Sequence, residues 1–196
     1  MPNLPPFFFL RFIHDPASTE RFIYIEPLYI YEEEIKEVRE MKEESAKRKM
    51  VIMVGAPAAG KSTYRKKWLS WMDSVDCDEV AEFHPDYDPK NPGKTHAWAS
   101  EVAWAVALEY MREGKSFVYD GTGANLQKYK TLIDEAHKMG YFVQMVYLTI
   151  SLEESLKRNS QRERTVAPEV VKNKFFQVEK AVNTLSRLVD KVQVVD

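Results

Sequence analysis

The sequence of 196 residues has one cysteine, no long apolar run and almost no net charge. Because Cys77 has no second cysteine to pair with, the chain cannot form an intramolecular disulfide, which suits a reducing compartment. The apolar residues 7–10 are too few to cross a bilayer, and they lack the basic segment and cleavage site of a signal peptide. The net charge of −2 gives no global positive field for membranes or nucleic acid. We therefore expect a cytoplasmic protein with no membrane partner.

What the sequence does contain is a phosphate-binding loop. Residues 55–62 read Gly-Ala-Pro-Ala-Ala-Gly-Lys-Ser and match the P-loop pattern G-x-x-x-x-G-K-[ST]. The apolar run 50–54 before it predicts a buried parallel strand, and residues 61–71 after it predict a helix. Backbone N–H groups of such a loop bind phosphate oxygens at the positive end of the helix dipole. The pattern predicts a nucleoside triphosphate site, with a glycine-rich turn that binds nothing as the alternative.

The positions of this loop have separate expected roles. We expect Lys61 to reach the β- and γ-phosphates of ATP and the Ser62 hydroxyl to ligate Mg²⁺. The other residues predicted to hold the nucleotide lie in the loop and the first helical turn: Gly55, Ala58, Ala59, Gly60 and Thr63.

From residue 50 to the end, strand and helix patterns alternate. The expected strands are 50–54, 75–77, 116–119, 142–149 and 192–195. The expected helices are 61–71, 95–113, 126–139, 152–159 and 169–188. This order predicts an α/β fold, a P-loop NTPase three-layer sandwich with a five-stranded parallel sheet, over residues 50–196.

Residues 1–49 are predicted to be an appendage to that domain. Aromatic and β-branched residues in 7–13 and 21–31 predict a two-stranded hairpin, in which Pro27 indicates a bend or an edge. Residues 32–49 predict a charged linker helix, acidic at its start and basic at its end. The hairpin aromatics are expected to pack within the hairpin. A base-stacking platform or an oligomer contact is the alternative.

Two aspartates follow the second predicted strand, where parallel α/β sheets bind their ligands. We expect Asp78 to be the general base that accepts the proton of an attacking hydroxyl. Asp76 is a rival base, a metal-shell residue or a substrate contact. Because Asp78 immediately precedes a helical pattern, it could instead serve only as a helix cap.

A second acidic loop, Tyr-Asp-Gly-Thr-Gly-Ala-Asn at residues 119–125, follows the third predicted strand. Asp120 resembles the Walker-B carboxylate that holds Mg²⁺ through water. Alternatively Asp120 and Thr122 bind the acceptor substrate, together with Asn125. A plain glycine-rich connection between strand and helix is the third possibility.

A basic cluster, residues 157–165, separates two predicted helices and suggests a lid over the phosphates. Arg158 and Arg164 are preferred as the groups that stabilise charge on the transferring phosphate, and Arg162 is expected to contact the nucleotide. Arg158 and Arg162 would share a helix face if the helix continued. The alternative is a solvated basic turn paired with neighbouring glutamates.

From Val51 onward the chain resembles P-loop kinases that include the zeta-toxin kinases and the phage-type polynucleotide kinases. Residues 76–78 (Asp-Cys-Asp) followed by His84 and Pro85 resemble the zeta-toxin segment in which an aspartate base precedes a His-Pro element. This resemblance places His84 on the acceptor side. The Asp-Gly-Thr-Gly loop is similar to the zeta-toxin loop that binds the acceptor, whereas residues 156–170 are closer to the polynucleotide kinase lid.

The residues and the resemblance together predict a kinase that uses ATP and Mg²⁺ to phosphorylate a hydroxyl of a nucleic acid or nucleotide. That hydroxyl would be a 5′-OH or lie on a hydroxymethylated base. The alternatives are a zeta-toxin-like kinase of a UDP-amino-sugar and a nucleotide-binding switch without catalysis. Two departures from the resemblance stand out. Little sequence follows Val195, where zeta toxins have further helices, and Ala81 stands where a polynucleotide kinase is expected to have a basic residue.

Overall fold

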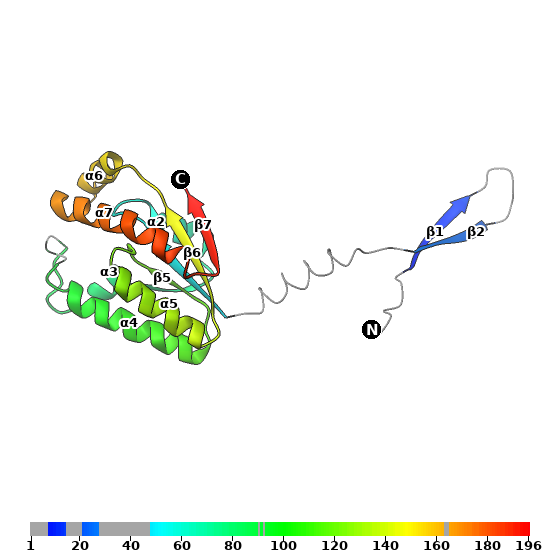
Figure 1. Cartoon of the computed structure of the whole chain (residues 1–196), viewed down its shortest axis with the longest axis horizontal. Helices are drawn as coiled ribbons and strands as arrows, with labels where there is room; N and C mark the ends of the chain where they lie inside the picture. The colour runs from blue at the N-terminus through cyan, green and yellow to red at the C-terminus, as the bar shows by residue number, and fades with distance from the viewer. Residues whose placement is uncertain (1–7, 15–20, 28–47, 90, 92, 163–164) are drawn as a thin grey trace. The chain divides into compact units, whose positions relative to one another are not determined.

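A parallel β-sheet follows the N-terminal region in the computed structural model (Figure 1). The structure describes residues 8–14, 21–27, 48–89, 91, 93–162 and 165–196, with side chains from residue 48 onward. The chain divides into two units between residues 46 and 47, and each is described by itself.

The C-terminal unit contains a five-stranded sheet with the strand order β4-β5-β3-β6-β7, all parallel. The strands are β3 (Lys49–Val54), β4 (Asp73–Asp76), β5 (Phe117–Asp120), β6 (Phe142–Leu148) and β7 (Lys191–Val195). The helices are α2 (Lys61–Trp68), α3 (Cys77–Ala81), α4 (His96–Glu113), α5 (Leu126–Lys138), α6 (Leu152–Ser160) and α7 (Pro168–Leu185). The predicted α/β fold with a five-stranded parallel sheet is confirmed, and β3 lies at its centre.

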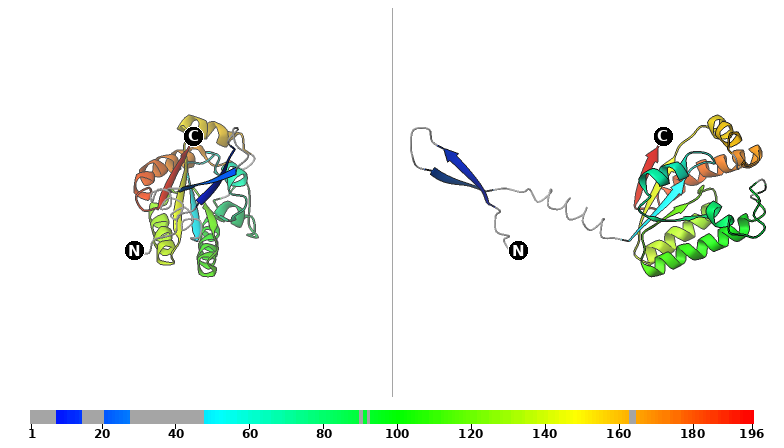
Figure 2. Two further views of the ribbon diagram at one scale, coloured as in Figure 1. Left: turned by 90° about the vertical axis from the view of Figure 1, so that its right-hand side faces the viewer. Right: turned by 180° about the vertical axis from the view of Figure 1, so that it is seen from behind.

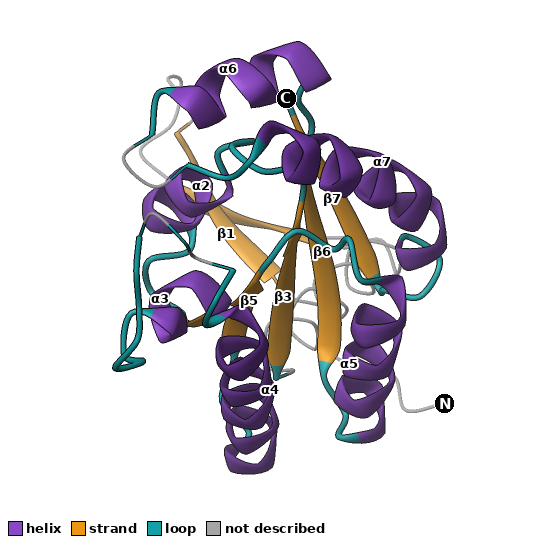
Figure 3. Cartoon of the chain, turned by 90° about the vertical axis from the view of Figure 1, so that its left-hand side faces the viewer, coloured by secondary structure: helices purple, strands orange, loops and turns teal. Residues whose placement is uncertain are grey.

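Helices cover both faces of the sheet. Successive side chains of the central strand point to opposite faces and are all apolar after Lys49, so each face has apolar side chains that the helices bury. Met50 and Ile52 point into a core made with α4, α5 and α7, whereas Val51 and Met53 pack on the face that α2 covers. Figure 3 shows these helices around the strands, and Figure 2 shows the sheet from behind. The result is three layers, with every side chain of β3 after Lys49 buried.

Several helix ends follow their sequence signals. The Ser151 side chain accepts a hydrogen bond from the Glu154 N–H at 3.1 Å and caps α6. Gly114 ends α4 in the left-handed conformation, with φ of 71°, and Pro168 opens α7. No helix in the described ranges is both long and apolar enough to cross a bilayer.

Sequence reasoning was wrong about one boundary beside the site. The second strand was expected to extend to Cys77, but β4 ends at Asp76 and α3 begins at Cys77. The reason is local: Asp76 Oδ1 accepts the Asp78 N–H at 2.8 Å and caps the new helix. The α2 and α7 helices also end three residues earlier than expected, at Trp68 and Leu185.

In the N-terminal unit, β1 (Phe8–His14) and β2 (Arg21–Pro27) pair antiparallel. The predicted hairpin is confirmed for its backbone. Most of the predicted helix 32–49 lies outside the described residues, which exclude 28–47. Its expected end at Lys49 is wrong, because Lys49 begins β3.

Candidate active site

The P-loop follows the central strand, and its backbone makes left-handed turns. Ala58 has φ of 59°, and Gly60, the N-cap of α2, has φ of 95°. The Gly55 N–H donates to the Thr122 carbonyl oxygen at 3.0 Å, which joins the P-loop to the loop after β5. A Cβ atom at Gly55 would lie 2.7 Å from the Leu148 carbonyl oxygen, so only glycine fits there.

The Lys61 amine lies inside the loop that precedes it. Its Nζ donates to the carbonyl oxygens of Gly55 and Ala56, each at 2.9 Å. Lys61 is the first residue of α2, so its backbone belongs to the helix terminus whose N–H groups lack helical partners. An amine and backbone donors at one helix terminus make a site for an anion.

The Lys61 amine also reports which other groups come near it. Burial is the main reason that the pKa of Lys61 is lowered to about 8, and the charge of Arg162 lowers it further. The charges of Asp120, Asp78 and Asp76 act in the opposite direction. The charges of four predicted site residues, from three segments of the chain, therefore act on this one amine.

Asp76 and Asp120 are brought together by the register of the sheet. They lie opposite each other at the carboxyl ends of the neighbouring strands β4 and β5. Burial, followed by the charge of Asp120, raises the pKa of Asp76 to about 7. Burial also raises the pKa of Asp120, against the charges of Lys61 and Arg65. Two carboxyl groups in low dielectric need a cation between them.

Arg65 is that cation, and sequence reasoning missed it. Its Nε donates to Asp120 Oδ2 at 3.1 Å, and its Nη2 donates to Glu79 Oε1 at 2.6 Å and to Asp76 Oδ2 at 3.3 Å. Its Nη1 donates to the Ser74 hydroxyl. We call these five residues the Arg65 cluster. It joins α2 to β4, α3 and β5.

A sequence signal for Arg65 did exist. It stands four residues after Lys61, so both side chains lie on one face of α2. Asp76 and Asp120 stand at the ends of two predicted strands, and a basic residue on the Lys61 face of the helix indicates an ion pair with them. The three acidic partners, Asp76, Glu79 and Asp120, lie outside α2 in the sequence, which hid the pairing.

Asp78 sits in the first turn of α3 and is exposed. The helix-cap role that was the alternative for Asp78 belongs to Asp76, which holds the Asp78 N–H. The Asp78 carboxylate therefore does not close the helix, and its role as a base stays a prediction.

The residues after β5 have structural partners of their own. Thr122 Oγ1 accepts the Ala124 N–H at 3.3 Å, and Asn125 Oδ1 accepts the Lys128 N–H at 3.1 Å as the cap of α5. These bonds set the path of the loop beside the P-loop. Contact of Thr122 and Asn125 with a substrate stays a prediction.

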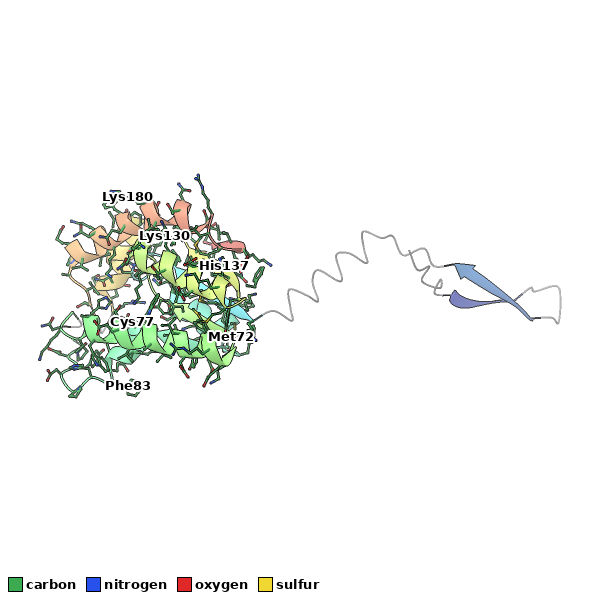
Figure 4. All side chains as sticks on the ribbon, turned by 60° about the horizontal axis from the view of Figure 1, so that its bottom comes forward. Met72, Cys77, Phe83, Lys130, His137 and Lys180 are labelled. Carbon is green, nitrogen blue, oxygen red and sulfur yellow. The ribbon has the colours of Figure 1, made fainter. Side chains whose placement is uncertain are left out.

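His84 lies in a turn held to helix α4. Its Nδ1 accepts the Asp86 N–H at 3.0 Å, and its ring meets Trp98 edge to face with the ring centroids 4.8 Å apart. Trp98 itself is 37% exposed. Phe83, beside His84, is 83% exposed and projects from the edge of the domain (Figure 4). The described residues at this turn thus present aromatic rings to solvent.

The predicted lid, residues 157–165, begins within α6, and two buried side chains of α6 anchor it. Ser155 Oγ donates to the Pro57 carbonyl oxygen at 2.7 Å, which ties α6 to the P-loop. Asn159 Nδ2 donates to the Val166 carbonyl oxygen at 2.7 Å, and Asn159 Oδ1 accepts the Val166 N–H at 3.2 Å. We call this stretch the lid segment.

The three lid arginines differ in their surroundings. Arg158 Nε donates to Glu154 Oε1 at 2.8 Å on the exposed side of α6, the pairing that was the alternative to a phosphate contact. The predicted helix 152–159 is confirmed within one residue, so Arg162 lies beyond the end of α6 and does not share a helix face with Arg158. The charge of Arg162 nevertheless acts on Lys61. Arg164 lies outside the described residues.

The residues proposed for Mg²⁺ suit an ion that binds together with a nucleotide. No group of three or more His, Cys, Asp or Glu in the described part of the chain could hold a metal alone. Mg²⁺ commonly takes one or two protein ligands and completes its shell with phosphate and water. Ser62 is exposed in the first turn of α2, beside Thr63, and Ala59 is buried before it. Asp120 would reach the ion through water, because Arg65 already occupies Oδ2.

The fold and the P-loop define a P-loop kinase. A family model described as zeta toxin matches residues 32–196. The chain therefore belongs to the zeta toxin family. No curated protein matches it by sequence.

Solved structures share the fold at low identity. A chain of the PezAT chromosomal toxin–antitoxin system of Streptococcus pneumoniae gives a TM-score of 0.59 at 16% identity, over 84% of this chain and 78% of that one. A chain of the Pnkp1/Rnl/Hen1 RNA repair complex gives 0.56 at 16% identity, over 70% and 46%. A chain of the AvrRxo1-ORF1:-ORF2 structure with ATP gives 0.59 at 18% identity, over 76% and 52%. The chain thus spans about half the length of the last two.

Proposed function

We propose that this chain is an ATP-dependent phosphotransferase that moves the γ-phosphate onto an acceptor hydroxyl. The observation that carries the proposal is the Lys61 amine inside the P-loop, on the same helix whose Arg65 binds the acidic ends of β4 and β5; the charges of Asp120, Asp78, Asp76 and Arg162 all act on this amine. A P-loop that served only as a switch would not need an exposed carboxylate such as that of Asp78 in the first turn of α3.

The transfer step follows from these groups. Asp78 accepts the proton of the acceptor hydroxyl while the oxygen of that hydroxyl forms a bond to the γ-phosphorus. The bond from that phosphorus to the bridging oxygen breaks, and ADP leaves. Lys61 and Arg162 offset the charge on the phosphate oxygens. Ser62, and Asp120 through water, would hold Mg²⁺, which would supply further positive charge to the phosphates.

For the acceptor we propose a UDP-amino-sugar, rather than the nucleic acid that was the first expectation from sequence. Membership of the zeta toxin family supports this choice. Residues 76–88, which lead away from Asp78, contain carboxylates and no lysine or arginine. A polyanionic nucleic acid strand would be repelled along this segment.

Cations for a diphosphate lie on the other helices. Burial raises the pKa of Cys77 to about 11, and the charges of Lys128 on α5 and Lys174 on α7 act against this rise. The charges of both amines thus act on Cys77, the residue before Asp78, and Lys128 Nζ donates to the Ser100 carbonyl oxygen at 3.1 Å and to the Ser100 hydroxyl at 2.6 Å. The two amines would hold the diphosphate of a nucleotide sugar and leave its sugar hydroxyl toward Asp78.

A nucleic acid or nucleotide hydroxyl remains the second candidate. The basic run Lys157, Arg158 and Arg162 in the lid segment favours it, since such side chains bind phosphates of a nucleic acid strand.

The test is a transfer assay with γ-labelled ATP and three acceptor sets: UDP-amino-sugars, oligonucleotides with a 5′-OH or hydroxymethylated bases, and free nucleosides. We expect label on the UDP-amino-sugars, and about 10²-fold slower labelling with Asp78→Asn as the matched control. Label on oligonucleotides alone would select the second candidate. ATP binding without label on any acceptor would contradict the proposed activity.

A further inference from the structure

Arg65 is the only residue of α2 that is buried, and its side chain is 9% exposed. Resting on the proposed function, we propose that Arg65 is a positioning residue that fixes the Asp78 base relative to Lys61. It does so without touching the reacting atoms, through the carboxylates that flank Asp78.

The geometry of the guanidinium explains why an arginine stands there. All three of its nitrogens donate, in three directions: Nε to Asp120, Nη1 to Ser74, and Nη2 to Asp76 and Glu79. A lysine has a single nitrogen on a flexible stem and cannot span acceptors on three segments at once. The planar fork therefore sets the distance between α2 and the ends of β4 and β5.

The path from Arg65 to the base is short. Asp76 accepts from Arg65 with Oδ2 and from the Asp78 N–H with Oδ1. Glu79, which follows Asp78, accepts from the same Nη2 atom at 2.6 Å. Both neighbours of the base are thus tied to the helix that carries Lys61. Movement of the β4–α3 junction away from the P-loop would have to break these bonds together.

Charge gives a second reason for the arrangement. Asp76 and Asp120 lie side by side in the sheet register, and both are largely buried. Without a cation between them, the two carboxylates repel, and the end of β4 would separate from β5. A triphosphate on Lys61 adds more negative charge to this place. Arg65 therefore offsets the repulsion between the acidic strand ends at a place where the phosphates of the nucleotide would add further negative charge.

A role in stability alone would predict something different. It would lower the unfolding free energy of the whole domain but leave the kinetic parameters of the remaining folded protein unchanged. A positioning role changes kcat in the folded protein, and its effect depends on the presence of the Asp78 carboxylate.

The first measurement is amide hydrogen exchange on the full chain, which needs no acceptor and no activity. The variants are Arg65→Met, Arg65→Lys and, as the matched control, Lys66→Met at an exposed position of the same helix. We expect exchange in residues 76–82 to become about tenfold faster in Arg65→Met, with β3 and β6 unchanged. Arg65→Lys should lie between, and Lys66→Met should match the wild type. Unchanged exchange in residues 76–82 would overturn the proposal.

The second measurement is a double-mutant cycle between Arg65 and Asp78 in the transfer assay. Arg65→Met should lower kcat about 10²-fold and change KM for ATP by less than about threefold. In the Asp78→Asn background the same substitution should cost little more, because both changes remove one positioned base. Full additivity of the two losses, or a loss confined to KM, would overturn the proposal.

The two measurements separate the possible failures. If no acceptor is phosphorylated, the proposed function fails, and the exchange experiment alone still decides whether Arg65 holds the β4–α3 junction. If Arg65→Met does not fold, Arg65→Lys and Glu79→Gln replace it. Each of these keeps part of the cluster, and we expect smaller changes in exchange and kcat of the same kind. No change in either variant would overturn the proposal.

Discussion

On one side of the P-loop, β4 and β5 are tied to α2 by a buried guanidinium, whereas on the other side α6 meets the loop through a neutral hydroxyl. The Arg65 and Asp120 side chains are 9% and 4% exposed, but those of Arg158 and Glu154 are 50% and 37% exposed. Breaking a buried ion pair leaves an uncompensated charge in low dielectric. An exposed pair is screened and contributes little. The comparison indicates that the β4–β5 side is held by buried charge, which would fix the geometry of the proposed base, and that the lid side carries its charge on exposed side chains.

The largest effect is expected at Lys61, where the two sides meet. Lys61→Ala removes the amine on which charged side chains of both regions act. Nucleotide affinity and the rate of transfer should therefore fall together, with turnover reduced about 10³-fold. Fluorescent ATP binding and label transfer measure the two quantities. Retained ATP affinity with normal turnover would show that the triphosphate binds elsewhere.

The next effect concerns stability and contrasts the two sides directly. Asp120→Ala leaves Arg65 without one partner in a buried site, and it should lower the unfolding free energy by about 3 kcal/mol. Glu154→Ala removes an exposed partner and should leave the unfolding free energy unchanged. Urea unfolding of both variants gives the comparison. Equal losses in the two variants would remove the distinction between the regions.

Within the lid segment, the structure orders the arginines differently from the sequence. Arg162→Gln should lower kcat about tenfold, because the Arg162 charge acts on Lys61. Arg158→Gln should change kcat by less than about threefold, since Arg158 pairs with Glu154. Steady-state assays at saturating ATP separate these values. A larger loss in Arg158→Gln would restore the ranking that was made from the sequence.

The smallest effect is expected from pH. The pKa of Lys61 is lowered to about 8, so its positive charge is present below that pH and is lost as pH rises through it. Triphosphate binding needs this charge, and kcat/KM for ATP should therefore decline about tenfold per pH unit above pH 8. Arg162→Gln removes a nearby cation and should move the decline to higher pH. A profile that stays flat up to pH 10 would contradict the buried position of the amine.

The parts of the site that could be predicted are those written in short stretches of sequence. The P-loop is a local pattern that fixes its own backbone turns, and Asp76 and Asp120 stand at strand ends that a parallel sheet must bring together. The position of Lys61 follows from the loop itself. These predictions needed only the order of the strands.

The parts that could not be predicted depend on distant partners. The burial of Arg65 could not be predicted, because the carboxylates that bind it lie on β4, α3 and β5. Its neighbours in the sequence do not indicate that it is buried. The capping role went to Asp76 because β4 ends there and α3 begins at Cys77, which the predicted strand 75–77 had included. The end of the predicted helix 152–159 is confirmed within one residue, since α6 ends at Ser160, before Arg162. The missed role of Arg65 thus concerns a side chain whose partners lie outside its own helix.

The measurement that tests the account most directly is a paired one on Asp78→Asn: ATP affinity by calorimetry and single-turnover transfer to the acceptor. The account predicts an ATP affinity within about threefold of the wild type and a transfer rate lowered about 10²-fold, because only the base is removed. Transfer at the wild-type rate would contradict it, since the proton would then be taken by another group.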